Sequence, residues 1–377
     1  MKFFRVVLVG IVACICGCGG NGSDPSPADN SKDRQEMLIN WADHIIIPSY
    51  DNFKEKFDIM VSESEEFTAS PSNETLTRFR SAWADAYGEW QMVELFEFGP
   101  ADRYTLRNFF NIYPADVAGI EANILDPLAN LEVPNSYPRQ GFPALDYLIN
   151  GVASDDAGII EYYTTGDDAP ERIAYISTLV GRMNTLITNV ITEWKGSYRD
   201  TFISSTGLDI GSSTGIVVNA YILNYERYIR SGKIGIPAGI VSSTVSGPAY
   251  PEKVEAYFKK DISKLLAIYA KYAAVVFFNG VGVTTGADGP SFKSYLDALG
   301  AKDPSTGTML SQIINDQFAV IDSKLNQLGP NFSEEVLNNN QAMKDLYSEM
   351  QKVVRLLKVD MSSAMSVTIT YTDNDGD

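Results

Sequence analysis

Hydrophobic residues recur at every third or fourth position along most of this chain. That spacing is the period of an amphipathic α-helix, so the pattern predicts long helices with one buried face each. The predicted stripes cover residues 50–60, 76–90, 176–194, 258–276 and 310–328, and a sixth helix follows over residues 333–358. An apolar face of this kind is far more often part of a protein core than of a cofactor site.

Local chemistry predicts where two of these helices begin. Ser70 is a capping residue, and Pro71 behind it suits the first helical position. Ser333 is the expected cap of the last long helix.

The pattern changes at the C-terminus and near the middle of the chain. Val367, Ile369 and Tyr371 alternate with threonines, which predicts one strand. Residues 204–215 are rich in Ser and Gly and form the best candidate boundary. We therefore expect an all-α fold of two helical-bundle-like halves packed together, residues 34–203 and 204–377, with a short β segment at the C-terminus.

The first residues have the features of a secretory leader. Lys2 and Arg5 precede an apolar run over residues 6–15, which is too short to span a bilayer and ends at a small-residue junction. Because Ile-Cys-Gly-Cys fits a bacterial lipobox, we expect residues 1–17 to be a lipoprotein signal peptide and Cys18 to be lipidated. Residues 18–33 would be a flexible tether. The alternative is an ordinary secreted protein.

Composition excludes several kinds of chemistry. The net charge of −18 argues against nucleic acid as a partner, because phosphate binding needs clustered cations. All three cysteines lie in the leader, so the mature chain has no disulfide and no thiol nucleophile. His44 is the single histidine, which removes both the paired-histidine zinc helix and the His-dependent triad; we expect it to be a packed or helix-surface residue. The acidic end, residues 373–377, lacks the rest of an EF-hand and is expected to be solvated rather than to bind calcium.

The order of several short motifs resembles the imelysin family, bacterial envelope proteins also described as insulin-cleaving metalloprotease-like. The resemblance covers roughly residues 35–377. Its motifs are residues 40–50, 94–100, 112–114, 218–219, 225–226, 232–239, 277–280 and 359–377. It implies two helical halves with a candidate site in the cleft between them, and a link to iron uptake through some relatives.

The family's hallmark, Gly-x-His-x-x-Glu, supplies metal ligands in the picture that the resemblance implies. It aligns with residues 141–146: Gly141 is kept, Pro143 replaces the histidine and Asp146 replaces the glutamate. Proline has no lone pair to give a metal, but it suits the first turn of a helix. Asp146 keeps a shorter carboxylate, which interacts favourably with the helix N-terminus.

Two further acids, Glu94 and Glu226, lie in family-like motifs and are candidates for the ligand site together with Asp146, Gly141 and Pro143. The competing interpretation is a structural ion pair with a cation such as Arg80, Arg139 or Lys233.

We expect a lipid-anchored protein of the bacterial cell envelope, at the periplasmic or surface face of the outer membrane. No catalytic residue, metal ligand set or cofactor can be assigned from the sequence. The leading hypothesis is a non-peptidase that binds a metal, small molecule, peptide or glycan fragment in the cleft, and its partners would be the membrane and an unknown ligand or envelope protein. The alternatives are a surface adhesin or assembly component, and a divergent carboxylate-based metallopeptidase or hydrolase.

Overall fold

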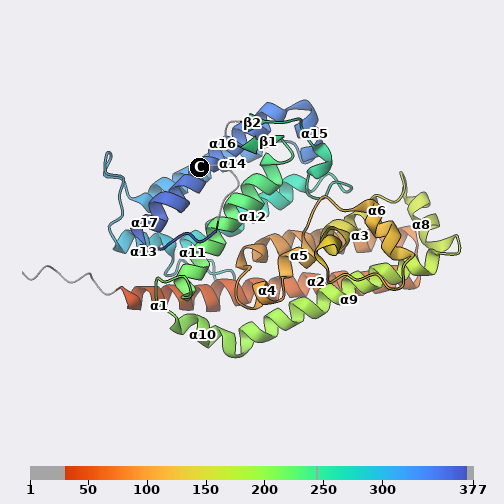
Figure 1. Cartoon of the computed structure of the whole chain (residues 1–377), viewed down its shortest axis with the longest axis horizontal. Coiled ribbons are helices and arrows are strands. Elements are labelled where there is room, and N and C mark those ends of the chain that lie inside the picture. The colour runs from red at the N-terminus through yellow and green to blue at the C-terminus, as the bar shows by residue number, and fades with distance from the viewer. Residues whose placement is uncertain (1–29, 243–244, 372–377) are drawn as a thin grey trace, which may run out of the picture. The chain divides into compact units, whose positions relative to one another are not determined.

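Helices build most of the chain that the computed structural model describes, residues 30–242 and 245–371 (Figure 1). The α-helices up to residue 204 are α1 (Ser31–Asn40), α2 (Ile47–Ala69), α3 (Asn73–Val93), α4 (Pro100–Arg103), α5 (Leu106–Phe110), α6 (Val117–Ile124), α7 (Gly141–Asn150), α8 (Asp156–Thr164), α9 (Ala169–Glu193) and α10 (Arg199–Ser204). Those after it are α11 (Ser213–Leu223), α12 (Ser263–Asn279), α13 (Phe292–Ala298), α14 (Leu310–Asn326), α15 (Phe332–Asn338), α16 (Asn340–Arg355) and α17 (Ser362–Ala364).

Several segments are wound more loosely or more tightly than an α-helix. The π-helical segments are η1 (Trp41–Ile46), η4 (Trp194–Tyr198), η5 (Asn224–Gly235) and η7 (Leu356–Met361), and the 3₁₀ segments are η2 (Glu94–Phe96), η3 (Pro134–Arg139) and η6 (Pro251–Lys253). π-helical turns are rare and are often found at functional sites. Of the candidate acids, Glu226 lies in the π-helical segment η5, and Glu94 lies in the 3₁₀ segment η2.

The predicted stripes along α2, α3, α9 and α14 lie in the core. Helices α2, α3 and α9 pack together, and Figure 1 shows α2 and α9 running side by side. Aromatic rings fill the space between them and the shorter helices: Trp90 stacks on Phe110 at 4.8 Å, and Tyr87 stacks on Phe142 at 4.6 Å. The second of these contacts fixes α7, which carries the hallmark motif, against α3.

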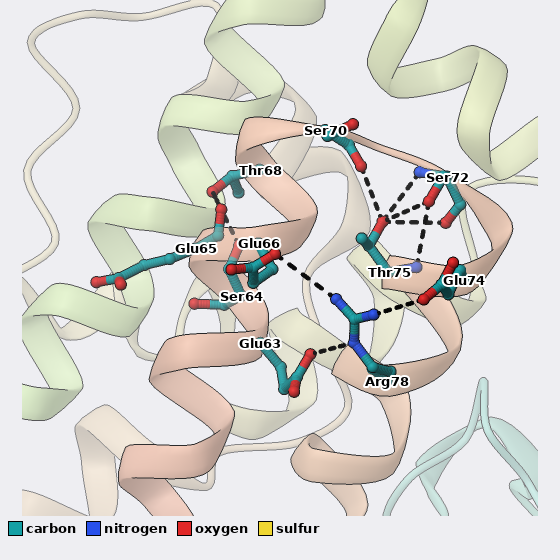
Figure 2. A network of polar contacts seen from close by, with 10 residues as sticks. All are labelled: Glu63, Ser64, Glu65, Glu66, Thr68, Ser70, Ser72, Glu74, Thr75 and Arg78. Atoms are coloured by element: carbon teal, nitrogen blue, oxygen red, sulfur yellow. Dashed lines mark hydrogen bonds and ion pairs between the residues drawn. The ribbon is translucent and has the colours of Figure 1, made fainter.

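A hydrogen-bonded turn joins α2 to α3 (Figure 2). Ser72 and Thr75 form a reciprocal capping box, so the helix starts two residues later than Ser70 and Pro71 predict. Arg78 reaches back from α3 to Glu63 at 2.8 Å, to Glu66 at 3.7 Å and to Glu74 at 2.9 Å. This Arg78 cluster lies on the surface.

Helices from the two predicted halves pack directly on each other. Helix α12 lies against α3, and the Trp41 ring stacks on Phe277 at 4.6 Å. The Asn40 side chain donates to the carbonyl oxygens of Gly280 and Pro290, both at 3.0 Å. From Ser31 onward the chain forms one compact unit, so the division into two halves and its boundary stay a prediction.

Three sequence predictions differ from the structure. Residues 367–370 form no strand; instead the Asn219 side chain donates to the Thr368 carbonyl at 3.0 Å and accepts from the Thr370 amide at 2.7 Å, which satisfies the extended backbone. The helix predicted over 333–358 is interrupted at Asn339, and Asn331 rather than Ser333 caps α15. The helix predicted from residue 258 begins only at Ser263, for a reason given below.

The strands that the structure does describe form a short antiparallel hairpin, β1 (Ile240–Ser242) and β2 (Val245–Ser246). The predicted signal peptide, Cys18, nearly all of the tether and the whole acidic end, residues 373–377, lie outside the described residues. Within the described ranges, no helix combines the length and apolar character that crossing a membrane requires.

Candidate functional site

The hallmark motif begins with a backbone that only glycine tolerates. Gly141 opens α7 with φ at +75°, and a Cβ added there would lie 2.3 Å from the Phe110 carbonyl oxygen. Gly141 is therefore required by a close approach between α7 and the end of α5. Pro143 lies in the first turn of α7, as predicted, and is buried.

Asp146 is the last residue of this motif and is only 1% exposed. Its carboxylate accepts hydrogen bonds from the Phe258 and Lys259 amides, both at 2.9 Å, and from the Asn150 side chain at 3.0 Å. Burial raises the pKa of the Asp146 carboxyl from 3.8 to about 7, although these hydrogen bonds act in the opposite direction. Asp146 thus ties α7 to a segment 112 residues further along the chain.

The same contacts explain the late start of α12. Ala256 and Lys260 adopt positive φ values of 55° and 68°, which a continuing helix cannot contain. Between them, the amides of Phe258 and Lys259 bond to the Asp146 carboxylate instead of to helical carbonyls. The apolar spacing of Phe258 and Ile262 correctly predicts that both side chains pack against the core, but it wrongly predicts that this segment is helical.

A buried polar network lies beside α3. We call its five members, Gln91, Glu94, Asn111, Lys233 and Glu255, the central polar network; each is less than 5% exposed. They come from α3, η2, the end of α5, η5 and the segment after η6.

Hydrogen bonds connect the five members completely. Lys233 forms an ion pair with Glu255 and donates to the Gln91 side-chain oxygen at 2.6 Å. Glu255 also accepts from Gln91 at 3.1 Å and from Asn111 at 2.8 Å. Asn111 donates in addition to Glu94 at 3.1 Å and accepts from the Tyr87 hydroxyl at 2.6 Å.

Arg107 supplies a second buried cation at the edge of this network. Its Nε lies 3.8 Å from a Glu94 carboxylate oxygen, and its guanidinium donates to the Glu94 carbonyl at 2.6 Å. The guanidinium also lies over the Tyr228 ring, 3.9 Å from its centre. Burial raises the pKa of the Glu94 carboxyl, while Lys233 and Arg107 lower it.

Glu94 does form a buried ion pair, but with Arg107 rather than with any of the three cations suggested from the sequence. Arg80 pairs with Asp156 and Arg139 pairs with Asp116, so both suggestions are wrong. Lys233 does belong to the same network, through Glu255 and Gln91 rather than by a direct contact.

Glu226 lies in a different cluster. Its carboxylate accepts from the Tyr371 hydroxyl at 2.7 Å and from Lys358 at 3.3 Å, and Arg230 lies 3.7 Å away. These partners come from the C-terminal segment, η7 and η5. Glu226 therefore connects the end of the described chain to η5 and η7.

Within the described residues no hydrogen bond or ion pair joins the three candidate acids: Glu94 lies in the central polar network, Asp146 bonds to residues 258–259, and Glu226 bonds to the C-terminal segment. The Tyr87 hydroxyl lies within electrostatic range of Glu255, Glu94 and Asp146, which add to burial in raising its pKa. Sequence reasoning missed Glu255, Asn111 and Gln91. Glu255 follows a proline in a turn-rich stretch where no periodicity marks it, whereas Gln91 could have been found from its place on the apolar face of α3.

Metal binding would need several ligands at one place. Among the described residues, no three His, Cys, Asp or Glu side chains are grouped so that they could hold an ion. Asp146 uses both of its oxygens on protein hydrogen bonds, and His44 is exposed on η1. The side chains of Asp146 and of the central polar network are instead bonded to other groups of the protein.

Comparison with known proteins agrees with this arrangement of motifs. The family model for imelysin, a peptidase M75 family, matches residues 46–359, and the chain belongs to the imelysin family. It is similar to iron-regulated protein A of Synechococcus elongatus, 25% identical over 114 residues; this match spans 30% of the chain and about a third, 31%, of that relative.

Two solved structures share the fold. The first, a candidate iron-regulated protein A precursor from Parabacteroides distasonis, has a TM-score of 0.70 at 17% identity and covers 91% of this chain and 96% of its own. The second, an imelysin-like protein from Psychrobacter arcticum, has a TM-score of 0.66 at 17% identity and covers 90% and 98%. At this identity the likeness shows the fold alone.

Proposed function

We propose that this chain is a cell-envelope lipoprotein of the imelysin family that has no peptidase activity and binds a small organic or peptide fragment beside Asp146 and the central polar network, in a role linked to iron. The observation that carries the proposal is the state of the hallmark motif. Pro143 offers no ligand, and both Asp146 oxygens are bonded to the Phe258 and Lys259 amides.

The central polar network supports a binding role. Burying Lys233 and Glu255 away from water is costly, and apolar residues of similar size would often stabilise a core as well or better. A fully hydrogen-bonded but expensive cluster is therefore expected where a fold serves a function. Amide, carboxylate and ammonium groups together can exchange their mutual bonds for those of a polar ligand.

The absence of peptidase activity can be tested on chelator-treated protein. We expect zinc, iron or calcium, added one at a time, to give no insulin cleavage above that of the Asp146→Asn protein, and no change in melting temperature. Metal-dependent cleavage that this substitution abolishes would overturn the proposal in favour of the divergent metallopeptidase.

The link to iron rests on the names of two relatives, both of which are called iron-regulated protein A. We expect transcription of the gene to rise under iron limitation, and a deletion strain to grow more slowly in chelated medium until the wild-type gene is returned. Equal growth of both strains over the whole range of iron supply would contradict the link.

Envelope anchoring is a separate part of the proposal. A Cys18→Ser protein should leave the membrane fraction, because it would lack the acyl chains that provide most of the membrane affinity. Wild-type protein found in the soluble periplasmic fraction would contradict lipidation and favour ordinary secretion.

The adhesin or assembly alternative has one observation in its favour. Leu125 and Leu128, in the loop after α6, are 63% and 87% exposed. If they form an attachment surface, a Leu125→Ser, Leu128→Ser protein should reduce attachment or assembly of the cells that carry it, and unchanged behaviour would remove this alternative.

A further inference from the structure

A cavity on the outer side of α3 carries an inference that does not rest on the proposed function. It has a volume of about 310 Å³, within the range of small-molecule sites. Its wall comes from α2, α3, α12 and the loop over residues 281–286. Glu89 and Met92 line it from α3, and Glu89 lies on the opposite side of that helix from Gln91.

One acid in this wall has no partner. Glu89 is half-buried, and within residues 30–242 and 245–371 it forms no hydrogen bond and no ion pair. Burial raises the pKa of its carboxyl; Lys56 lowers that pKa and Asp85 raises it, although neither touches Glu89 closely enough to pair. A partly desolvated carboxylate without a partner favours a ligand with a positive charge.

Aromatic residues supply the second feature. Tyr269 and Tyr272 lie one turn apart on α12 and line the cavity, and Tyr272 is 52% exposed. Gly88 allows this arrangement, because a Cβ at that position would lie 2.9 Å from the Tyr269 ring. Glycine therefore lets the ring lie against α3, directly beside Glu89, and ring faces attract cations.

Apart from Asn52 on α2, the side chains of the remaining wall are apolar, and its loop is held in place. Val276, Val281 and Val283 line it together with Met92. The loop is fixed by the Val283 amide, which donates to the His44 carbonyl at 2.9 Å, and by the Gly282 amide, which donates to Ala287 at 2.9 Å. The stripe predicted as core along α12 includes Tyr269, Tyr272 and Val276, which line this cavity; a different set of residues on the same helix, Leu266, Ala270, Ala273 and Phe277, is buried in the core.

We infer that this cavity binds a small organic cation, an amine with an apolar or aromatic body, with Glu89 facing the ammonium group and Tyr269 and Tyr272 against its ring or chain. The charge, the two aromatic rings and the apolar floor each match one part of such a molecule. The single acid limits the ligand to one positive charge.

The test uses benzylamine and its neutral analogue benzyl alcohol as probes. Titration of the full chain, followed by calorimetry and by the amide resonances of Gly282 and Gly286, should show benzylamine binding at least tenfold more tightly than benzyl alcohol. In the Glu89→Gln protein this preference should disappear, whereas benzyl alcohol should bind as before, which also shows that the cavity is intact.

A matched control separates a site from general attraction to an acidic protein. Asp85→Asn removes the same charge from an exposed position one turn away on α3, outside the cavity wall. It should change benzylamine affinity by less than about twofold. Equal affinity for the two probes, equal effects of the two substitutions, or shifts that do not reach Gly282 and Gly286 would each overturn the inference.

Discussion

Two charged clusters in this molecule use the same chemistry in opposite surroundings. Arg78 faces three acids on the surface at the turn between α2 and α3, whereas Lys233 faces Glu255 deep beside α3 (Figure 2 shows the first). Water already solvates the first cluster, so its pairs add little. The second has no water to replace a lost partner, so each of its members depends on the others.

The largest effect is expected from Lys233→Met. This substitution removes the positive charge that balances the buried carboxylates of Glu255 and Glu94. Breaking a buried ion pair in this way lowers the unfolding free energy by about 3–5 kcal/mol. Urea denaturation measures this loss, with Lys32→Met, in an exposed pair with Glu36, as the matched control. If the Lys233→Met, Glu255→Met double variant is more stable than Lys233→Met, an uncompensated acid is the cause; equal losses from Lys233→Met and Lys32→Met would contradict the comparison.

Asp146→Asn should give the next largest effect. The amide nitrogen of Asn cannot accept, so one of the Phe258 and Lys259 amides loses its partner, at a cost of about 1–3 kcal/mol. Hydrogen exchange should speed up at residues 258–259 before it does in α12. Unchanged exchange there would show that the segment does not depend on the Asp146 carboxylate.

The same pair of proteins tests the pKa of Asp146. Burial raises that pKa from 3.8 to about 7. Between these two pH values the Asp146 carboxyl is therefore protonated in the folded state and ionised in the unfolded state. The contribution of Asp146 is therefore fully present below pH 4 and is lost as the pH rises to about 7, by up to about 1.4 kcal/mol per pH unit. Asp146→Asn should remove this slope from the curve of unfolding free energy against pH, and parallel curves would contradict it.

Tyr371→Phe should have a smaller effect. It removes one hydrogen bond to Glu226, whose carboxylate keeps Lys358 and Arg230, so we expect a loss of about 0.5–1.5 kcal/mol. The destabilisation should be local, so that hydrogen exchange becomes faster at the Thr370 amide but not in the helices. If Tyr371→Phe lowered the unfolding free energy of the whole protein as much as Lys233→Met does, the contacts of Glu226 would be as important for stability as the central polar network.

Arg78→Gln should have the smallest effect, although it breaks three ion pairs at once. We expect the melting temperature to fall by no more than about 2 °C, and by less still at high salt. A fall of several degrees would remove the distinction between the two clusters.

Local patterns in the sequence predict most of the helices but little of the site. The stripes along α2, α3, α9 and α14 follow from periodicity, because each helix buries one face of its own. The Asp146 contacts join positions 112 residues apart, and nothing in the spacing of Phe258 shows that its amide is bonded elsewhere. The motif contains Gly141, but the reason that this position needs glycine, the nearby Phe110 carbonyl, depends on tertiary structure.

The Asn40 side chain has a consequence for how the chain acquires its structure during synthesis. Its partners, the carbonyls of Gly280 and Pro290, are 240 and 250 residues downstream. At translation rates of about 5–20 residues per second, they appear roughly ten to fifty seconds after Asn40. Asn40, at the end of α1, can therefore form these hydrogen bonds only after most of the protein has been made. In a truncated chain that ends before residue 280, α1 should be cleaved more readily by proteases.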